Sequence, residues 1–550
     1  MGNDRVLDGP AKLPVRQLAI LAACRFAEPL AYTSVFPYMP EMIKSFGVDE
    51  TNVAKWVGIT GAAFSLAQCT TAIAWGRASD YFGRKPMVIL ALFSTMVTSL
   101  VFGLSTSLPM AIAARAGSGA CNGNVGIMRT MVAEMVPEKS LQPKAFSVMP
   151  LIWAVGSTVG PAFGGMFAKP VEKFPSLFGH NRFFTKFPFA LPNLMAGVFF
   201  TIGLTFAIFF LKETLEAKEK RRDYGLIVGQ KILDCFKFKA KRSRGHSDVD
   251  DESTGALLGA VSTTSRSSMD DDVDWTPAEI KPVKPAQAPP GIKEVFTRQT
   301  SINLLTYTIL ALHNVAFDQL LPVFLNHSTQ VPNEHNTRLP FKFSGGFGLA
   351  SDRIGTLFML FGICSGIIQF TIFPPTARRY GVLNCLKACA ITFPLVYFVV
   401  PYTALIQTPL VQQAVMLGIM VVKSFCIVFA FPCMMILLTN SASSLRVLGT
   451  LNGFATSLSA LGRAFGPAAS GVLFTWGVDQ GYVITPWWAL GVISALGAIP
   501  VWHIKETDGF TNSSESVVNG IPGEDETQNG EAQLPIINDE DDELIPRYHS

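Results

Sequence analysis

The sequence predicts an all-α membrane protein in which twelve transmembrane helices form two six-helix pseudo-repeats. The first observation is composition: of 550 residues, 49% are hydrophobic and only 15% are charged, whereas soluble domains have about 25% charged residues. The second is that apolar stretches long enough to cross a bilayer, roughly 20 residues each, recur along the chain. The third is a weak repeat of motifs between the two halves. Because lipid offers no partner to backbone polar groups, such stretches form helices.

The predicted spans fall into two groups of six, separated by a long polar loop. They cover residues 17–39, 53–75, 86–105, 109–133, 146–168, 189–211, 301–324, 352–373, 382–403, 410–438, 448–475 and 486–504. This order predicts five regions: a cytoplasmic tail at 1–16, a first bundle at 17–211, a disordered cytoplasmic linker at 212–300, a second bundle at 301–504 and an acidic cytoplasmic tail at 505–550. The linker has too few apolar residues to bury a core.

The distribution of basic residues predicts that both termini are cytoplasmic. The loop at 212–298 then lies in the cytoplasm, and its 16 Lys and Arg agree with the excess of basic residues in cytoplasmic loops. The loop at 169–188 runs against this rule, because it would be external yet contains four basic residues. Within the linker, 224–244 is either a basic amphipathic helix on the membrane surface or a solvated charged run.

The two halves carry related motifs. The segment 156–165 in span 5 recurs as 462–471 in span 11, and the turn between spans 2 and 3 recurs between spans 8 and 9. Glu28 of span 1 aligns with His313 of span 7. Internal symmetry of this kind is typical of transporters whose substrate site lies between two bundles near the bilayer midplane.

A charged turn between spans 2 and 3 is the most informative motif. Gly76 and Gly83 would let the two helices approach closely. Asp80 either pairs with the adjacent cations or lies at the N-terminus of a neighbouring helix, where the backbone dipole favours an anion. We therefore predict a gating cluster whose contacts break as the cytoplasmic side opens. Its predicted members are Gly76, Asp80, Gly83, Arg84 and Lys85, joined by Arg129 and Glu134 from the end of span 4.

Ionisable residues inside the spans are the best candidates for the site. Each costs roughly 2.5–3.5 kcal/mol at a helix centre, so such residues usually face a cavity or a partner. Six lie well inside spans: Arg25, Glu28, Arg115, Asp318, Lys423 and Arg463.

Glu28 is the first candidate for a proton carrier. Arg25 lies three residues before it, on the same helical face. An opposite charge favours the ionised carboxylate and burial favours the neutral acid, so an acid balanced between the two can bind and release a proton. Asp318 is the second candidate, and His313, whose side chain titrates near neutrality, is the third. The alternatives are a permanent Arg25–Glu28 ion pair and a hydrogen-bonded packing role for His313.

Four cations against two acids predict a cationic cavity, which favours anionic or zwitterionic cargo. Lys423 and Arg463 either bind such a substrate or neutralise Glu28 and Asp318. The predicted substrate cavity contains Arg25, Asn314, Lys423 and Arg463.

Span 5 has a repeated small-residue face. Gly156, Gly160 and Gly164 recur every four residues and offer a flat surface to a neighbouring helix, and Gly165 follows them. Pro161 removes one backbone hydrogen bond and can bend the helix. This face is either a sliding interface or plain close packing.

These motifs resemble those of the major facilitator superfamily, and of its drug:proton antiporter branch in particular. The turn at 76–85 resembles the superfamily's loop motif, and the span-5 glycines resemble a motif associated with antiporters. Arg115 opens a segment similar to the branch's span-4 arginine motif, with Ser118 in place of a glutamine. The resemblance implies that Arg115 takes part in proton transfer or holds the substrate. Segments closest to fungal and plant zinc-induced-facilitator-like carriers are 25–29, 187–193 and 211–215.

The sequence therefore predicts a secondary active transporter that exports a small organic molecule, such as a drug, toxin or secondary metabolite, against proton entry. The alternatives are an uptake or facilitated carrier for a nutrient or metal chelate, and a non-transporting membrane sensor. No enzymatic activity and no cofactor are expected, because the chain has neither a P-loop nor the Cys and His spacing of a metal site.

The expected partners are the small-molecule substrate, protons and the lipid bilayer, with no nucleic acid. The chain is expected to be a multi-pass monomer in the plasma membrane, with the vacuolar membrane as the alternative. The triplet that begins at Asn326 predicts glycosylation in an external loop.

Overall fold

The protein is helical, as predicted. The computed structural model describes residues 13–136, 145, 148–179, 181–215, 218, 223–231, 292–330, 337–441 and 445–506. Within these residues there is no strand, and the β-bridges are isolated ones such as Arg338–Lys342. Most of the predicted linker and of both predicted tails lies outside the described residues, so the disorder of the linker stays a prediction there.

The helices of the first half follow the predicted spans closely. They are α1 (Val15–Ser34), α2 (Met39–Ser45), α3 (Val53–Phe82), α4 (Arg84–Gly103), α5 (Leu108–Ala120), α6 (Asn124–Met135), α8 (Val148–Phe167) and α12 (Ala190–Phe209), with the short helices η1 (Glu50–Asn52), α9 (Pro170–Lys173), α10 (Pro175–Phe178) and α11 (Arg182–Lys186) between them. The fourth predicted span is divided into α5 and α6 at residues 121–123.

The second half repeats this order after α15 (Ile292–Val295). Its helices are α16 (Arg298–Asn326), α17 (Ser351–Ile367), α18 (Phe373–Tyr380), α19 (Val382–Val399), α20 (Pro409–Asn440), α21 (Leu445–Asp479) and α22 (Thr485–Ala498). A π-helical segment, η3 (Ile368–Ile372), joins α17 to α18, and the 3-10 segments η4 (Val400–Leu405) and η5 (Ile499–His503) follow α19 and α22.

Eight of the described helical segments are long and apolar enough to cross a membrane by themselves. These are Glu50–Phe82, Arg84–Gly103, Ala190–Phe209, Arg298–Asn326, Ser351–Tyr380, Val382–Leu405, Pro409–Asn440 and Thr485–His503. The bent pair α1 and α2, with 56° between its parts, makes a ninth, and Leu151–Phe167 is a shorter apolar helix. Every predicted span thus contains a helix, which is consistent with twelve spans.

Equivalent glycines make the two tight turns of the repeat. Gly83 separates α3 from α4 with φ 107°, and Gly381 separates α18 from α19 with φ 82°. Positive φ is open to glycine and strained for other residues, so a glycine ends each long helix here. We call the end of the bundle that carries both turns the turn end, and the opposite end, which carries α2 and α9, the far end.

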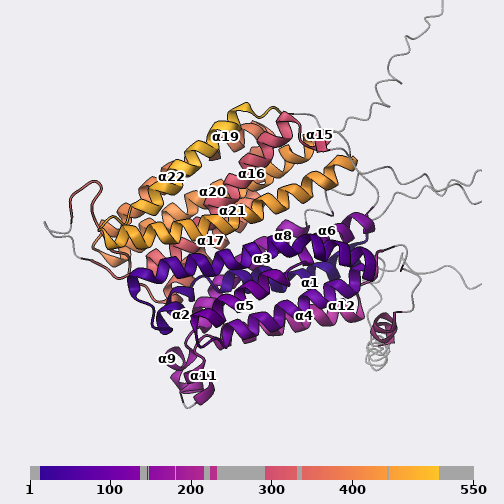
Figure 1. The fold of residues 1–550 in the computed structure, drawn as a ribbon, viewed down its shortest axis with the longest axis horizontal. Helices are drawn as coiled ribbons and strands as arrows, with labels where there is room; N and C mark the ends of the chain where they lie inside the picture. Colours follow the sequence, from indigo (N-terminus) through magenta and orange to yellow (C-terminus); the bar gives the residue numbers. More distant parts are fainter. Residues whose placement is uncertain are drawn as a thin grey trace, which may run out of the picture. The chain divides into compact units, whose positions relative to one another are not determined.

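The two halves meet mainly along two helix pairs (Figure 1), α3 with α21 and α8 with α17, and α16 also contacts α3. One buried apolar cluster lies wholly in the first half and includes Leu21 and Phe200. A second cluster is centred in the second half but continues into far-end residues of the first half, such as Tyr38 and Val57. The cores therefore merge at the far end.

Candidate functional site

Glu28 lies inside the first bundle, in a network of polar side chains. Only 5% of its surface is exposed. Arg25, one turn earlier on α1, donates to Glu28 Oε2, and Asn122, from the break between α5 and α6, donates to Glu28 Oε1 at 2.7 Å. The predicted Arg25–Glu28 pair therefore forms. Sequence reasoning missed Asn122, which lies 94 positions away in the chain.

Arg115 lies beside this network on α5. Its guanidinium is 4.9 Å from the centre of the Phe64 ring and 5.2 Å from that of Tyr32, and Nη2 donates to the Tyr32 carbonyl at 3.4 Å. Aromatic faces attract a desolvated cation. No carboxylate pairs with Arg115 among the described residues, and its Nε is buried without a hydrogen-bond partner.

A small cavity joins Glu28 to Arg115. Its volume is about 20 Å³, which is room for about one water molecule. The lining residues are Glu28, Ala31, Tyr32, Val35, Phe64, Thr95, Ser99, Phe102, Arg115, Ser118, Asn122 and Asn193. Within the described part of the chain, Thr95 Oγ1 and Asn122 Oδ1 are also buried without partners. A water here would have several polar groups to bond.

The second half contains a different ion pair. Lys423 Nζ on α20 lies 2.5 Å from Asp318 Oδ1 on α16 and 4.1 Å from the centre of the Phe317 ring. The Lys423 side chain is fully buried, whereas 27% of the Asp318 side chain is exposed. Asn314 Nδ2 donates to Asp318 Oδ2 at 3.3 Å. Of the two roles predicted for Lys423, the structure shows neutralisation of Asp318.

His313 has the bonded, packed environment that the sequence left as an alternative. Its Nδ1 is 2.7 Å from the Tyr397 hydroxyl, its ring contacts Phe393 edge-on, and only 4% of its surface is exposed.

Arg463 bridges the two halves without a carboxylate. Its Nη1 donates to Ser459 Oγ at 3.1 Å on the same helix, and its Nη2 donates to Gln68 Oε1 on α3 at 3.4 Å. No carboxylate within reach of Arg463 is found among the described residues. It therefore does not neutralise Glu28 or Asp318, and of its two predicted roles only substrate binding stays open.

The turn end carries the predicted charge cluster. Asp80 Oδ1 lies 2.5 Å from Arg84 Nη1, so the acid pairs with an adjacent cation. Arg84 Nη2 donates to Glu134 at 2.9 Å. Among the described residues Arg129 bonds to no member of the cluster, and its Nη1 instead donates to Thr456 Oγ1 of the second half at 3.5 Å.

Gly83 and Gly76, the two glycines predicted for the charged cluster, have different surroundings. At Gly83, the positive φ strains any residue with a Cβ, and an added Cβ would also lie 2.6 Å from Glu213 Oε2. At Gly76, an added Cβ would meet no atom of the described residues within 4 Å. Within the described part of the chain, the prediction that Gly76 permits a close helix approach is therefore wrong.

Glu213 is a turn-end residue of the segment 211–215, and the sequence predicted no role for it. Its Oε1 accepts from the backbone N–H of Arg84 at 2.8 Å, and its Oε2 from that of Lys85 at 3.1 Å. The carboxylate thus satisfies free donors at the first turn of α4, where the helix dipole favours an anion. An acid 128 positions along the chain from Lys85 gives no local signal of this contact.

The start of the linker also docks on the turn. Lys85 Nζ donates to Asp223 at 2.6 Å and to the Ile208 carbonyl at 2.9 Å. Burial alone would raise the pKa of Asp223, but the Lys85 ammonium and the Leu226 N–H hold that pKa below its ordinary value. A helix at 224–231 follows, and its Gly225 and Gly229 lie against the last carbonyls of α12. The described part of 224–244 is therefore helical.

The span-5 glycines face two different helices. Added Cβ atoms at Gly156 and Gly160 would lie 2.6 Å from Pro29 and 2.7 Å from the Leu30 carbonyl, both on α1. Gly164 also lies on α1, against the Ser34 backbone. Gly165 instead faces α17 of the other half, where its Cβ would lie 2.8 Å from Gly355 Cα, and the Pro161 carbonyl approaches the same residue.

Short polar contacts close the halves against each other at the far end. Glu41 Oε1 accepts from the Ser351 N–H at 2.6 Å. Lys173 donates to the Gly165 carbonyl at 2.6 Å and to Ser351 Oγ at 3.0 Å, and burial lowers the pKa of this lysine. Lys169 pairs with Glu41 at 3.2 Å. Of the basic residues that run against the orientation rule, Lys173 therefore bonds across the halves through Ser351, and Lys169 pairs with Glu41 within the first half.

Contacts between the halves are longer toward the turn end. Besides the bonds of Arg463 and Arg129, Cys69 Sγ lies 3.8 Å from the Ser457 carbonyl. The described residues thus show a state that is closed at the far end.

Asn326 lies at the end of α16, and its Nδ2 donates to the Leu349 carbonyl at 2.9 Å. A glycan on this nitrogen would have to displace that hydrogen bond. Its modification stays a prediction.

Comparison with known proteins places these features in a family. Residues 21–335 match the family profile described as Major Facilitator Superfamily. The chain is 37% identical to the Major facilitator superfamily multidrug transporter mfsB of Aspergillus fumigatus, over 92% of this chain and 86% of that protein. It is 27% identical to Protein ZINC INDUCED FACILITATOR-LIKE 1 of Arabidopsis thaliana, over 86% of this chain and 87% of that protein.

A solved structure, the crystal structure of a D-xylose-proton symporter, is similar with a TM-score of 0.61. The sequences are 11% identical, and the match covers 91% of this chain and 100% of that one. At this identity the likeness concerns the fold alone. The predicted resemblance of the chain to the major facilitator superfamily and to zinc-induced-facilitator-like carriers is therefore confirmed.

Proposed function

The chain belongs to the Major Facilitator Superfamily, and from this premise we propose that it exports a small organic molecule in exchange for protons. It is a secondary transporter and an integral membrane protein.

The environment of Glu28 is the observation that carries the proton assignment. The carboxylate is buried, it contacts one cation and one amide, and it lines a cavity large enough for a single water. A proton delivered through that water would neutralise Glu28 and release Arg25 from the pair. Rearrangement of Arg25 would then couple protonation to a change of conformation, since a buried cation does not stay unpaired without cost.

The two ends of the bundle support an alternating-access cycle. In the described state the far end is closed by the bonds of Lys173 and Glu41 to Ser351. Opening would require these bonds to break while new contacts form at the turn end, where Asp80 and Arg84 lie. We place the turn end in the cytoplasm, in agreement with the basic linker that leaves it.

The charges of the site favour an anionic or zwitterionic cargo. Arg25 and Lys423 have carboxylate partners, whereas Arg115 and Arg463 have none among the described residues. A guanidinium presents paired donors that match a carboxylate or phosphate. The aromatic rings around Arg115 would contact an apolar part of the same molecule. Export of organic molecules agrees with the relative named as a multidrug transporter.

Flux measurements on the purified chain in proteoliposomes test the proposal. We use an organic anion such as 2-naphthoate as the transported reporter. An imposed pH gradient should drive accumulation of this reporter in vesicles that contain the wild-type protein. Glu28→Gln should abolish the dependence of transport on the pH gradient and keep downhill flux. Asp318→Asn should keep the dependence on the pH gradient. If Glu28→Gln still concentrates the reporter against its gradient, Glu28 is not the proton carrier.

The same vesicles separate export from the alternative, a facilitated carrier for a nutrient or metal chelate. Collapse of the pH gradient with an ionophore should stop uphill transport by an antiporter. Flux that is indifferent to the gradient would identify a facilitator instead. The proposal further places the protein in the plasma membrane as a monomer, with the vacuolar membrane as the alternative.

A further inference from the structure

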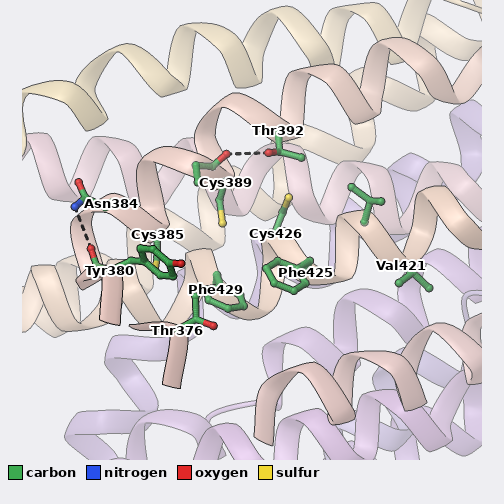
Figure 2. A pocket seen from close by; sticks show the side chains of 12 residues that line it. Thr376, Tyr380, Asn384, Cys385, Cys389, Thr392, Val421, Phe425, Cys426 and Phe429 are labelled. Carbon is green, nitrogen blue, oxygen red and sulfur yellow. Dashed lines mark hydrogen bonds between the residues drawn. The ribbon is translucent and has the colours of Figure 1, made fainter. Parts of the chain in front are cut away.

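A second cavity lies away from the charged site, on the outer side of the second half. It is a crevice of about 560 Å³ between α19 and α20, with α18 at one end (Figure 2). Its lining is Thr376, Tyr380, Asn384, Cys385, Ala388, Cys389, Thr392, Val421, Val422, Phe425, Cys426 and Phe429. None of the residues assigned above to proton or substrate binding lines it.

Small side chains on one face of α19 create the crevice. Cys385, Ala388 and Cys389 are spaced three and four residues apart, so they share a face. The opposite wall is formed by Phe425 and Phe429, whose rings stack with centres 4.6 Å apart. Figure 2 shows Cys389 of α19 and Cys426 of α20 near each other in the crevice. Small residues facing a rigid aromatic wall leave a gap that neither helix fills.

The rim of the crevice is open to the surroundings of the helices. Tyr380 is 57% exposed, Val422 48% and Phe425 39%, whereas Cys389 and Cys426 on the floor are buried. On a membrane-spanning bundle, such an exposed apolar rim faces lipid. An unfilled gap loses the dispersion contacts of its lining atoms, so a flexible lipid chain is the natural occupant.

The length of the crevice matches one leaflet. The first and last lining residues are eight residue steps apart on α19, from Asn384 to Thr392, and eight steps apart on α20, from Val421 to Phe429. At 1.5 Å per residue this is roughly 12 Å, and half of a hydrocarbon core of about 30 Å is roughly 15 Å. One acyl chain of the leaflet at the turn end would fit along it.

The mouth of the crevice carries positive charge. The Arg379 guanidinium lies 5.5 Å from the centre of the Tyr380 ring, and Tyr380 lines the mouth. Arg378 and Arg379 are exposed, and no described carboxylate pairs with either. Nearby on α19, the Lys387 ammonium lies 5.1 Å from the ring of the exposed Trp502. Exposed Tyr and Trp beside basic residues are typical of headgroup depth.

We propose that this crevice binds one anionic phospholipid, with an acyl chain between α19 and α20 and the phosphate on Arg379 and Arg378. The lipid packs α19 against the stretch of α20 that contains Lys423. If the turn end is cytoplasmic, the leaflet concerned is the one enriched in anionic lipid. This site is independent of the cargo and of proton coupling.

Native mass spectrometry of the purified full-length protein tests the proposal. Micelles would be titrated with phosphatidylserine or with phosphatidylcholine of the same acyl chains, and retained lipids counted. We expect one phosphatidylserine to be retained in preference to phosphatidylcholine. Arg379→Gln should weaken phosphatidylserine retention about fivefold, which corresponds to the ~1 kcal/mol of one basic residue near an anionic surface, and should leave phosphatidylcholine unchanged.

Two further variants separate the acyl chain from the headgroup. Ala388→Trp points a ring into the crevice from an exposed position and should abolish retention of both lipids. Arg353→Gln, at the exposed far-end start of α17, is the matched control and should behave as the wild type. Wild-type retention by Ala388→Trp, or equal effects of Arg379→Gln and Arg353→Gln, would overturn the proposal.

Competition identifies the source of the phosphate. Glycerophosphoserine, which has the headgroup without chains, and inorganic phosphate should not displace the retained lipid at equal concentration. Displacement by either would show an anion site on the arginines alone, and the lipid proposal would then be wrong.

Discussion

The two halves of the molecule each bury an ion pair, but they build it differently. In the first half, Arg25 and Glu28 are one turn apart on α1 and both are buried. In the second half, Lys423 and Asp318 come from different helices, and only the lysine is fully buried. A same-helix pair is set by local spacing and moves as one unit, whereas a pair between helices breaks when α16 and α20 move apart. This difference agrees with our proposal that Glu28, and not Asp318, carries the proton.

The two turns show the same contrast. Gly83 and Gly381 both have positive φ, but the first turn is braced by Glu213 and by Asp80. At the second turn, arginine stands where Asp80 stands in the repeat, and among the described residues the nearest atom to a Cβ at Gly381 would be a Glu506 carboxylate oxygen at 4.0 Å. The braced turn belongs to the half that we propose carries the proton.

The largest expected effect comes from breaking the pair of the first half. Arg25→Met leaves the Glu28 carboxylate buried with Asn122 as its remaining partner, so we expect a loss of about 3–5 kcal/mol of folding stability. Unfolding in detergent micelles measures it. The double variant Arg25→Met with Glu28→Leu should recover most of the loss, because no buried charge is left unpaired. An Arg25→Met protein as stable as the wild type would contradict the pairing.

The pair of the second half should respond asymmetrically. Asp318→Asn leaves Lys423 buried, partly offset by the Phe317 ring, and should cost about 2–3 kcal/mol. Lys423→Met leaves a partly exposed Asp318 that water can solvate, and should cost only about 1 kcal/mol. The same unfolding assay measures both variants. Equal losses would mean that both charges are equally shielded from water, as in the first half.

Alanine at the turn glycines compares the two turns. Gly83→Ala and Gly381→Ala both force a side chain into positive φ, which costs roughly 1–3 kcal/mol, and Gly83→Ala should lie at the upper end because its Cβ would be 2.6 Å from a Glu213 oxygen. Gly76→Ala is the matched control, expected to be neutral or slightly stabilising. Thermal unfolding of the three variants ranks them, and a cost at Gly76 equal to that at Gly83 would refute the distinction.

The smallest effect is expected at Asp223, the partly exposed partner of Lys85 at the turn end. Asp223→Asn removes the partner of Lys85 and should change global stability by less than about 1 kcal/mol, yet it should speed amide exchange in 224–231. Because the pKa of Asp223 is lowered, its contribution is present above the ordinary aspartate range and is lost only as the pH falls through the folded-state pKa. Exchange measured between neutral and acid pH checks both points. Unchanged exchange in the variant would show that the ion pair does not hold this helix.

Part of the site could be predicted from the sequence because its signals are local. The Arg25–Glu28 pair follows from helical spacing, and the Asp80–Arg84 pair from a motif one turn long. The spacing of the span-5 glycines likewise predicts a small-residue face. Only the structure shows that Gly165 packs against a different helix from Gly164. Gly76 shows the limit of such reasoning, because a glycine in a helix does not reveal whether anything approaches it.

The sequence by itself determined that this is a helical membrane protein of two related halves, because hydrophobic length and backbone pairing in lipid leave little other choice. Only the tertiary structure decided which charges meet. Asp318 and Lys423 are 105 positions apart, and Glu213 caps a helix far from it in the chain. Such contacts depend on how helix surfaces pack and on which end of the bundle is closed. That packing depends on many side-chain contacts of comparable energy. The local spacing of residues in the sequence does not show which of these contacts form.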